Sequence, residues 1–567
     1  MITVGLAHDL FISSAAVIKD GQVVAAIAEE RLNRQKQYKG FPTLAFKECL
    51  RLGGITLKDV AAIAFGWNPT RHLEFPNYRE SNNARWRAEY LYAIPNMVLG
   101  VTKQPSGEWM EQLLGDMDTR IRYYDHQLAH AANAYYLSGY DRAAVYTADG
   151  RGERDTAYWG WADRGGFYKL GGSYFPHSLG LVYGTVTQYL GFRPDSDEWK
   201  VMALAAYGEP GNRYYPIMRS LIDVNPSTGR FFVDQKYFSY AQPEVYGGRF
   251  YTPDFVECFG PARDGNDNIE QRHSDISWAL QQVFEETMTV ILTSLHRQTG
   301  EPRLVAAGGC MMNSVYNGKL TRQTPFKELF VSSCPDDSGI SVGAALLAYH
   351  QLAEQPQSAD HPDNYWGPSY DDQILPTLQN YKLHFTRLEN PADTAAQLLV
   401  DGLLIGWYQG RMEFGQRALG NRSILVDPRR PDAKDVVNSA VKYREGFRPF
   451  APAILAERVH DFFCAEPAGQ VPFMERVYMF REDMRDQVPG VVHVDGSGRL
   501  QTLEREHNSR FYDLIKRFET LTGVPIVLNT SFNLNGEPIV CTPADAIRTF
   551  YSCGLDALII GDYLIRK

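Results

Sequence analysis

Residues 143–152 read Ala-Ala-Val-Tyr-Thr-Ala-Asp-Gly-Arg-Gly, an apolar run that ends in an acid and a glycine-containing turn. Strand-like spacing resumes after the turn, from Thr156 to Trp161. An apolar segment, a turn and a second apolar segment are typical of a β-hairpin. The stretch therefore predicts a hairpin whose turn carries the carboxylate of Asp149.

The start of the chain repeats this order. Residues 2–7 form a mostly apolar run that leads into His8-Asp9, and residues 14–18 and 22–28 read as two strands. The Asp20-Gly21 pair between those strands marks a tight turn. Two similar hairpin starts, far apart along the chain, indicate an internally duplicated α/β domain. This is the plan of the actin-like ATPase folds, in which both hairpin turns face a nucleotide.

The remaining pattern predicts the rest of this domain and a second one. Residues 274–298 have the apolar spacing of a long amphipathic helix, and residues 304–307 read as a strand. Residues 353–371 are polar and contain prolines, which is typical of a linker. We therefore expect a first domain over residues 1–352 and a second α/β domain over residues 372–567.

The composition is that of an ordinary folded protein, with 44% apolar and 22% charged residues among 567. The net charge of -10 argues against a surface that coats nucleic acid. The seven cysteines form no CxxC pair, which indicates reduced thiols in a cytoplasmic protein rather than a structural zinc site. The sequence has neither a signal-peptide pattern nor an apolar run long enough for a membrane helix, so we expect no membrane partner.

Two histidines one helical turn apart give the sharpest chemical signal. His126 and His130 stand at i and i+4, a spacing that lets both imidazoles reach one metal ion. Asp149 and Asp337, each at a predicted strand or helix end, would complete a set that suits a divalent first-row ion. The alternatives are ordinary helical histidines, and aspartates that cap a turn or a helix.

Glycine-rich and cation-rich segments indicate phosphate binding. Gly308-Gly309 follows a predicted strand, where backbone can approach a nucleotide, although a tight turn is an alternative. The C-terminal half has three arginines in residues 410–423 and three further cations in residues 442–448, interleaved with Gly, Phe and Pro. Arginine forks and lysine charges bind phosphates well, whereas a solvated basic surface rarely needs such neighbours.

Ten motifs carry a family resemblance, and they occur in the same order as in that family: Ala28-Glu29-Glu30-Arg31, His126 to Ala131, Asp149-Gly150, Ser178-Leu179-Gly180, Lys200 to Ala205, Gly308-Gly309 with Asn313, Asp337, Glu413 to Ser423, Arg448 to Pro452, and Asn529 to Asn533. With these motifs the chain resembles the NodU/CmcH/TobZ-type O-carbamoyltransferases over essentially its whole length.

The resemblance implies a two-site enzyme. The first domain would have the actin-like (ASKHA) fold of the threonylcarbamoyl-transfer enzymes, and the second would be YrdC-like. The second domain would use carbamoyl phosphate and ATP, with Mg²⁺, to form carbamoyl adenylate. The first domain would then pass the carbamoyl group to a hydroxyl of a small acceptor at a metal-bearing site. Natural-product biosynthesis, including that of antibiotics, is the expected setting, and a homo-oligomer is one expected assembly.

The resemblance also assigns residues. His126, His130, Asp149 and Asp337 match the metal ligands, with iron as the expected ion and manganese or zinc as alternatives. In the first domain, the residues expected to bind nucleotide or carbamoyl adenylate are Gly150, Gly180, Lys200, Gly308, Gly309 and Asn313. In the second domain, those expected to bind carbamoyl phosphate and ATP are Arg417, Arg422, Lys442, Arg448, Arg499, Asn529, Ser531 and Asn533.

The first hairpin departs from the family pattern. The family usually has a His-Asp pair just before a Ser/Ala run, and that histidine is the expected transfer base. A gapless match places Phe11-Ile12 there, and His8-Asp9 lies three residues earlier. Either an extended turn brings His8 into the site as the catalytic base, or His8 is a structural residue at the strand end.

Two other functions stay open at this stage. One is an ATP-dependent switch or scaffold on an actin-like fold, and the other is threonylcarbamoyl transfer to tRNA. The cation-rich second domain beside a complete metal set counts against the switch. The acidic net charge and the fused second domain count against tRNA modification.

Overall fold

The computed structural model describes residues 1–8, 12–68, 71, 121–241, 243–354, 363–442, 445–465 and 470–567. The chain forms two compact units, each built from several segments. Unit 1 comprises Met1–Glu29, Lys39–Asn313 and Leu320–His361. Unit 2 comprises Glu30–Tyr38, Ser314–Lys319 and Pro362–Lys567. Two short segments of the first domain expected from the sequence thus belong to unit 2, which the sequence pattern did not predict. Residues 355–362 of the expected linker lie outside the described residues.

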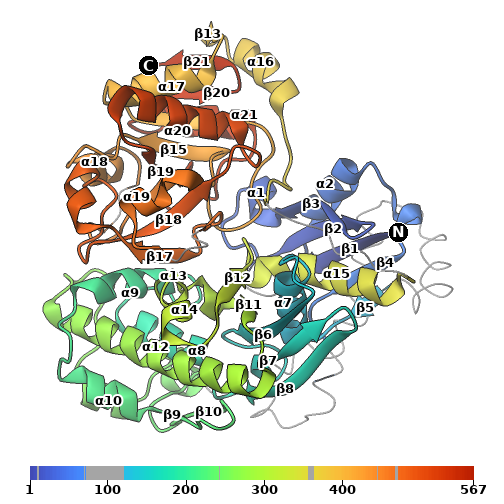
Figure 1. Cartoon of the computed structure of the whole chain (residues 1–567), viewed down its shortest axis with the longest axis vertical. Coiled ribbons are helices and arrows are strands. Elements are labelled where there is room, and N and C mark those ends of the chain that lie inside the picture. Colours follow the sequence, from blue (N-terminus) through green and yellow to red (C-terminus); the bar gives the residue numbers. More distant parts are fainter. Residues whose placement is uncertain are drawn as a thin grey trace. The chain divides into compact units, whose positions relative to one another are not determined.

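The first sheet of unit 1 contains the N-terminal hairpin. Its order is β3-β2-β1-β4-β5, with β1 antiparallel to β2 and parallel to β4 (Figure 1). The central strands are almost wholly buried, because helices cover the sheet, and so they read as continuous apolar runs. The strands are β1 (Ile2–Ala7), β2 (Ser14–Lys19), β3 (Gln22–Ala28), β4 (Ala62–Phe65) and β5 (Ile121–Tyr123).

The second sheet of unit 1 repeats the first. Its order is β12-β11-β6-β7-β8, with β6 antiparallel to β7 and parallel to β11. Each sheet is therefore a three-stranded meander followed by two parallel strands, so the predicted internal duplication of an α/β domain is confirmed. The strands are β6 (Arg142–Ala148), β7 (Asp155–Asp163), β8 (Gly166–Tyr174), β11 (Arg303–Ala307) and β12 (Glu328–Val331).

Helices of unit 1 follow the predicted apolar spacing. The helix expected over residues 274–298 is α12 (Gln271–Thr299), which ends at Gly300 in the left-handed conformation that favours glycine. The other helices among the described residues of unit 1 are α2 (Thr43–Gly53), α7 (His126–Tyr135), α8 (Leu179–Tyr189), α9 (Glu198–Leu204), α10 (Tyr214–Ser220), α11 (Pro253–Phe259), α14 (Leu320–Gln323) and α15 (Ile340–Leu352). A small hairpin pairs β9 (Ile222–Val224) with β10 (Phe231–Val233).

Close backbone packing holds α7 and α15 in place. Helix α15 contacts both β1 and α7. A β-carbon at Gly5 would stand 1.7 Å from the carbonyl oxygen of Ser341, and one at Gly343 would stand 1.9 Å from that of Ala129. Only glycine permits approaches this close. The start of α15 and the histidine-bearing helix α7 are thereby fixed beside the first sheet.

Unit 2 is a mixed α/β structure around a nine-stranded sheet of order β13-β21-β20-β14-β15-β19-β16-β18-β17. Its core gathers apolar residues of the central strands and of α17 and α20. The strands are β13 (Thr386–Arg387), β14 (Ile405–Tyr408), β15 (Arg422–Val426), β16 (Ala451–Leu455), β17 (Arg476–Met479), β18 (Ser497–Leu503), β19 (Ile526–Ser531), β20 (Ala557–Ile560) and β21 (Tyr563–Arg566). The helices are α1 (Glu29–Asn33), α13 (Ser314–Asn317), α16 (Asp371–Asn380), α17 (Pro391–Val400), α18 (Ala433–Val437), α19 (Val459–Phe462), α20 (Ser509–Thr522) and α21 (Pro543–Tyr551).

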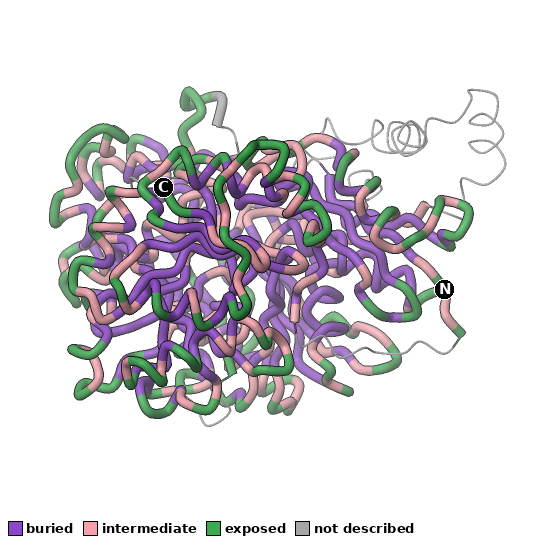
Figure 2. The backbone as a smooth tube through the Cα atoms, turned by 90° about the horizontal axis from the view of Figure 1, so that it is seen from above, coloured by how far each residue is buried: buried purple, intermediate pink, exposed green. Residues whose placement is uncertain are grey.

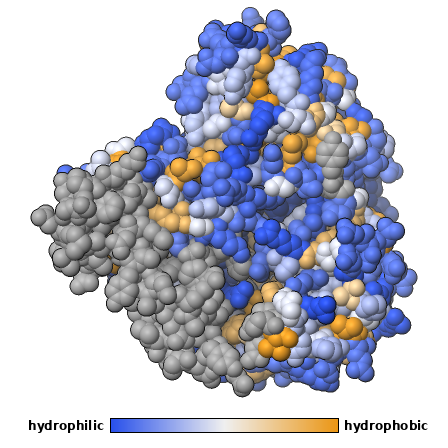
Figure 3. All heavy atoms as spheres, turned by 180° about the vertical axis from the view of Figure 1, so that it is seen from behind, coloured by the Kyte–Doolittle hydropathy of each residue, from blue (hydrophilic) through white to orange (hydrophobic). Residues whose placement is uncertain are grey.

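Burial follows the sheets. Central strands such as β1, β6 and β14 are almost wholly buried, and the extended stretches of the tube in Figure 2 are largely purple. On the face drawn in Figure 3, hydrophilic residues predominate and hydrophobic ones occur in small groups. Of the helices that the structure describes, none combines the length and the apolar character needed to cross a bilayer.

Candidate metal centre and anion-binding residues

The two histidines of the candidate metal centre lie on one face of α7. Both side chains are fully buried, and their ring centroids stand 4.7 Å apart. The helix is fixed at its first turn by Glu153, whose carboxylate accepts hydrogen bonds from the backbone N–H groups of His126 (3.0 Å) and Asn68 (2.6 Å). The predicted helical spacing of the pair is therefore present in the structure.

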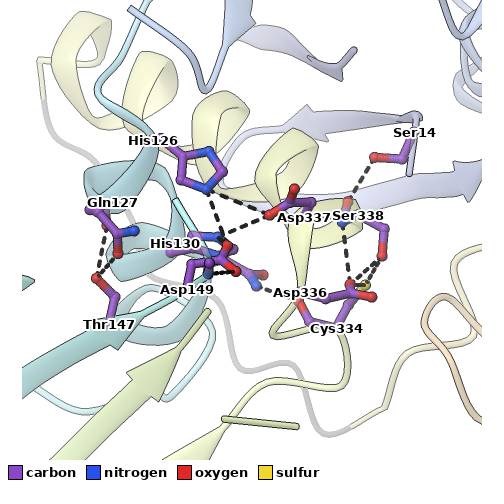
Figure 4. Close-up of polar contacts among 12 residues, drawn as sticks. Ser14, His126, Gln127, His130, Thr147, Asp149, Cys334, Asp336, Asp337 and Ser338 are labelled. Carbon is purple, nitrogen blue, oxygen red and sulfur yellow. Dashed lines mark hydrogen bonds and ion pairs between the residues drawn. The ribbon is translucent and has the colours of Figure 1, made fainter. Parts of the chain in front are cut away.

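Two aspartates complete the cluster, each at the end of an element. Asp149 follows β6 at the hairpin turn, and Asp337 begins a short 3-10 turn (Asp337–Gly339) before α15. Asp149 Oδ2 lies 3.2 Å from the Nε2 atom of His126 and 3.0 Å from that of His130. Asp337 Oδ1 lies 3.5 and 3.4 Å from the same two nitrogens. One ligand atom from each residue falls within 4.8 Å of the others (Figure 4), so the four predicted ligands are brought together.

The electrostatics of this buried cluster favour a cation among the carboxylates. Burial lowers the pKa of His130, but its hydrogen bonds to Asp149 and Asp337 outweigh burial and raise it to about 9. Burial opposes ionisation of Asp149, yet hydrogen bonds from both histidines hold its pKa well below the ordinary value. Burial and the nearby charge of Asp149 raise the pKa of Asp337 to about 6. Two imidazole nitrogens and two carboxylates, all nine-tenths buried, fit a divalent first-row ion.

A further residue of α7 holds the loop that carries Asp337. The side-chain amide of Asn133 donates to the hydroxyl of Ser332 (2.9 Å) and to the carbonyl oxygen of Cys334 (2.7 Å). Asn133 stands seven residues after His126, so all three polar side chains share one helix face. Sequence reasoning missed Asn133, although this i, i+4, i+7 spacing was available as a signal.

The loop is also held from β2. Ser14 Oγ donates to the carbonyl oxygen of Ser338 at 2.7 Å, next to the candidate ligand Asp337 (Figure 4). The carboxylate of Asp336 accepts from the backbone N–H of Ser338 at 3.2 Å and from its hydroxyl at 2.5 Å. Asp337 is therefore flanked by residues whose own positions are fixed by hydrogen bonds.

The glycines expected at a nucleotide site lie at the end of β6, around Ala148 and Asp149. Gly150 donates its N–H to Asp149 Oδ1 at 2.6 Å, and a β-carbon at Gly180 would stand 2.8 Å from the carbonyl oxygen of Asp149. A β-carbon at Gly309 would stand 2.8 Å from Asp149 Oδ1. Gly308 has φ 92°, and its β-carbon would lie 2.1 Å from the carbonyl oxygen of Ala148, so it must be glycine.

The polar residues expected near these glycines have partners of their own. Asn313 exchanges two amide hydrogen bonds with Gln281, at 2.8 and 3.1 Å. Lys200 forms an ion pair with Asp197 at 3.0 Å. The hydrogen bonds fix the Asn313 amide, and Lys200 lies at the start of α9.

His8 is buried at the end of β1, with its ring centroid 5.5 Å from that of Phe41. The pairing of β1 with β2 ends at Ala7 and Ser14. Asp9 and Phe11, on which the family comparison of this hairpin depends, lie outside the described residues. Strand β2 begins at Ser14, which is tied to the Asp337 loop.

Lys442 is the centre of the candidate anion site in unit 2. Its ammonium group is fully buried and donates to the carbonyl oxygens of Ser531 (2.5 Å) and Asn533 (2.9 Å) and to the side-chain oxygen of Asn533 (2.9 Å). Arg448 is also buried and pairs with Glu445 at 2.7 Å. Three of the predicted residues are thus in direct contact. Tyr443 and Arg444, in the same motif, lie outside the described residues.

The glycine-rich stretch before β15 is a loop whose backbone is held by hydrogen bonds to the side chains of Glu413 and Asn529. Glu413, which sequence reasoning did not single out, accepts from the backbone N–H groups of Leu419 (2.8 Å) and Asn421 (2.7 Å). Asn529 donates to the carbonyl oxygen of Ala418 at 3.1 Å. An acid at the start of a glycine-rich segment was the available signal for Glu413. Arg417 lies within this loop, and Arg499 lies on β18.

Arg422 occupies a different environment from the one expected. Its side chain is fully buried and stacks 3.7 Å from the ring centroid of Tyr408. Its guanidinium donates to the carbonyl oxygens of Gln409 (2.6 Å), Asn421 (2.9 Å) and Gly410 (3.1 Å). These contacts favour a structural role for Arg422, because its donors are directed at backbone.

Comparisons with known proteins find similarity over most of the chain. The family model described as Carbamoyltransferase N-terminus matches residues 3–346, and the one described as Carbamoyltransferase C-terminus matches residues 396–567. The Uncharacterized protein sll1178 of Synechocystis is 35% identical, over 99% of this chain and 95% of its own length. The Nodulation protein NolNO of Sinorhizobium fredii is 36% identical, over 99% of this chain and 79% of its own. Among solved structures, the (R)-2-hydroxyglutaryl-CoA dehydratase component A of Acidaminococcus fermentans covers 62% of this chain at 14% identity, with a TM-score of 0.32.

Proposed function

This chain belongs to the carbamoyltransferase family, and we propose that it is an ATP-dependent O-carbamoyltransferase that acts through carbamoyl adenylate. Carbamate is a poor acyl donor until one of its oxygens carries a good leaving group. Water first cleaves carbamoyl phosphate to carbamate and inorganic phosphate. Attack of a carbamate oxygen on the α-phosphorus of ATP, with loss of pyrophosphate, then supplies AMP as the leaving group. An acceptor hydroxyl then attacks the carbamoyl carbon, and AMP departs.

Transfer is assigned to residues 1–352, on the strength of one observation. His126, His130, Asp149 and Asp337 place four ligand atoms within 4.8 Å of one another in a buried site. Gly150, Gly180 and Gly309 lie close to Asp149, and Gly308 lies against Ala148. A bound divalent ion, for which iron is our first candidate and manganese and zinc are alternatives, would polarise the carbamoyl carbonyl. The glycines leave room for backbone to lie against the adenylate.

His8 is the proposed base for the acceptor hydroxyl. A neutral imidazole near pH 7 can accept that proton. His8 directly follows β1, and the strand paired with β1 begins at Ser14, which is hydrogen-bonded beside the candidate ligand Asp337. This connection supports placing the first hairpin at the transfer site.

Adenylation is assigned to residues 372–567, for which we propose a YrdC-like fold. Lys442 and Arg448 would neutralise the phosphates of ATP and carbamoyl phosphate, with Mg²⁺ bound to ATP. Ser531 and Asn533, which surround the Lys442 ammonium group, fix the position of this charge. Arg417, Arg499 and Asn529 are kept as further members of this site, whereas Arg422 is kept as support for its backbone.

The acceptor proposed is a small hydroxylated molecule, in line with the two-step chemistry. A switch or scaffold built on the same fold would bind ATP without consuming carbamoyl phosphate, and a tRNA-modifying enzyme would require tRNA for turnover. Pyrophosphate release by the purified chain separates these cases. Release that depends on both ATP and carbamoyl phosphate, without RNA, is the expected result. Pyrophosphate release at the same rate with and without carbamoyl phosphate would overturn the proposal.

A further inference from the structure

The motif Ala28-Glu29-Glu30-Arg31 has no role in the chemistry above, yet it opens a segment with an unusual position. Residues Glu30–Tyr38 belong to unit 2, although they lie between β3 and α2 of unit 1 in the sequence. Glu29, the residue before the segment, stays in unit 1, where its carboxylate accepts from the backbone N–H groups of Leu44 (3.2 Å) and Ala45 (2.7 Å). The segment Glu30–Tyr38 is called the strap below.

Two arginines of the strap bind backbone carbonyls in unit 2. Arg31 is buried, pairs with Glu30 at 2.7 Å and donates to the carbonyl oxygen of Gly415 at 3.0 Å. Arg34 donates to the carbonyl oxygens of Pro538 (2.7 Å) and Ile539 (2.6 Å). Its guanidinium also lies 3.5 Å from the carboxylate of Asp545.

These carbonyls belong to the two loops that carry candidate phosphate-binding residues. Gly415 lies between Glu413, which organises the glycine-rich loop, and Arg417. Pro538 and Ile539 follow Asn533, whose amide donates to the carbonyl oxygens of Leu534 and Glu537, both within the same loop. One short segment therefore contacts both loops, each through an arginine.

The backbone of the strap is held in a costly conformation. Arg34 and Gln37 have φ of 62° and 54°, in the left-handed region where residues other than glycine are strained. The N–H of Gln37 donates to the carboxylate of Glu30 at 2.6 Å, which closes the strap on itself. Such strain persists where the surrounding contacts over-determine it, and it is concentrated at functional sites.

We propose that Arg31 and Arg34 are positioning residues for the adenylate-forming site. They fix the loop of Arg417 and the loop that follows Asn533, so that both present their polar groups to the same phosphates. Both arginines donate to backbone carbonyl oxygens, so the effect proposed for them on substrate is indirect. This inference rests on the proposed function, because it assumes that the two loops bind ATP and carbamoyl phosphate.

The experiment uses the full chain with Arg31→Ala, Arg34→Ala and Arg34→Lys. Arg430→Ala is the matched control, because Arg430 also binds a backbone carbonyl, that of Gly402 at 2.5 Å, and an aspartate, Asp432 at 2.7 Å. Hydrogen exchange measures the two loops directly, and carbamoyl-phosphate-dependent pyrophosphate release measures the KM for carbamoyl phosphate and kcat.

We expect faster exchange in residues 413–421 for Arg31→Ala and in residues 534–541 for Arg34→Ala. The KM for carbamoyl phosphate should rise by about 10-fold or more, as for other misplaced binding groups, with Arg34→Lys between Arg34→Ala and wild type. Arg430→Ala should change neither readout. The inference would be overturned if hydrogen exchange in the two loops were unchanged. It would also be overturned if the loops exchanged faster but the KM of the variant for carbamoyl phosphate stayed the same. A wild-type chain that releases no pyrophosphate would refute the proposed function, and the exchange measurement would still decide whether the arginines hold the loops.

Discussion

Asn133 of α7 donates a hydrogen bond to the carbonyl oxygen of Cys334 at 2.7 Å, and it thereby joins the helix of His126 and His130 to the loop of Asp337. Histidines on a helix and an aspartate on a distant loop can share one ion only if both elements are held together. This contact supplies that connection. It makes Asn133 the residue through which the geometry of the centre can be tested without removing a ligand.

Replacing Asn133 should weaken metal binding while leaving all four ligands in place. Loss of an outer hydrogen bond of this kind typically costs about 10–100-fold in metal affinity, and we expect Asn133→Ala to fall in that range. Competition with a chelator, followed by elemental analysis, measures it. Asn212→Ala is the control, because the Asn212 amide likewise donates to two carbonyl oxygens, those of Glu209 and Asp275. Equal metal affinity in both variants would remove Asn133 from the centre.

Removal of both histidines tests whether carbamoyl transfer and adenylate formation take place at separate sites. The double variant His126→Ala/His130→Ala should lose the tightly held ion and carbamoyl transfer. Pyrophosphate release should remain near the wild-type rate, since Lys442 and Arg448 lie in unit 2. Elemental analysis measures the bound metal, and the rates of carbamoyl transfer and of pyrophosphate release are measured separately. A wild-type protein that is purified without chelator and contains no stoichiometric metal would refute the metal assignment.

His8 gives a kinetic prediction. If it accepts the proton of the acceptor hydroxyl, His8→Ala should slow transfer by about 10²–10⁴-fold, the usual worth of general-base help. Adenylate formation should be unaffected. The comparison requires a variant with wild-type circular dichroism and melting temperature. Unchanged transfer in such a protein would show that His8 is structural, and the base would have to be sought elsewhere.

His350 predicts how stability depends on pH. Burial lowers its pKa to about 4, and its ring stacks 3.7 Å from that of Tyr136. A histidine whose folded pKa is depressed stays neutral when folded, so its protonation in the unfolded chain destabilises the protein as pH falls from about 6.5 toward 4. The side chain is half-buried, so solvent screening limits the effect to about 1–2 kcal/mol. His350→Phe should lose less stability between pH 7 and pH 5 than wild type, measured by thermal unfolding. An equal loss would contradict the assignment.

The sequence predicted those parts of the site that local periodicity determines. The i and i+4 spacing predicts that His126 and His130 share one helix face. Asp149 ends an apolar run, and Asp337 comes just before a predicted small-residue helix. The repeated hairpin pattern also predicted the duplication, since each hairpin leads into two parallel strands. These features depend on the spacing of residues within one or two elements.

Features that depend on tertiary packing could not be predicted from the spacing of residues along the sequence. Arg31 and Arg34 look like helix-end surface residues, yet their segment belongs to unit 2. Arg422 has the residue type of a phosphate ligand, but its strand position turns it toward backbone carbonyls. Glu413 is significant only because the loop after it folds back over its carboxylate. In each case the partner is distant in sequence, or is a backbone group that no side-chain pattern marks.

The most direct test of the account is whether the chain makes carbamoyl adenylate. Wild type, the double variant His126→Ala/His130→Ala and Arg448→Ala are incubated with ATP and ¹³C-labelled carbamoyl phosphate, and the quenched nucleotides are analysed by mass spectrometry. We predict labelled carbamoyl adenylate with wild type and with the double histidine variant. Arg448→Ala should form it more slowly by about 1.5–3 kcal/mol in activation free energy, the worth of one charge-assisted contact. Intact ATP with no labelled adenylate in wild type, or normal formation by a folded Arg448→Ala protein, would contradict the account.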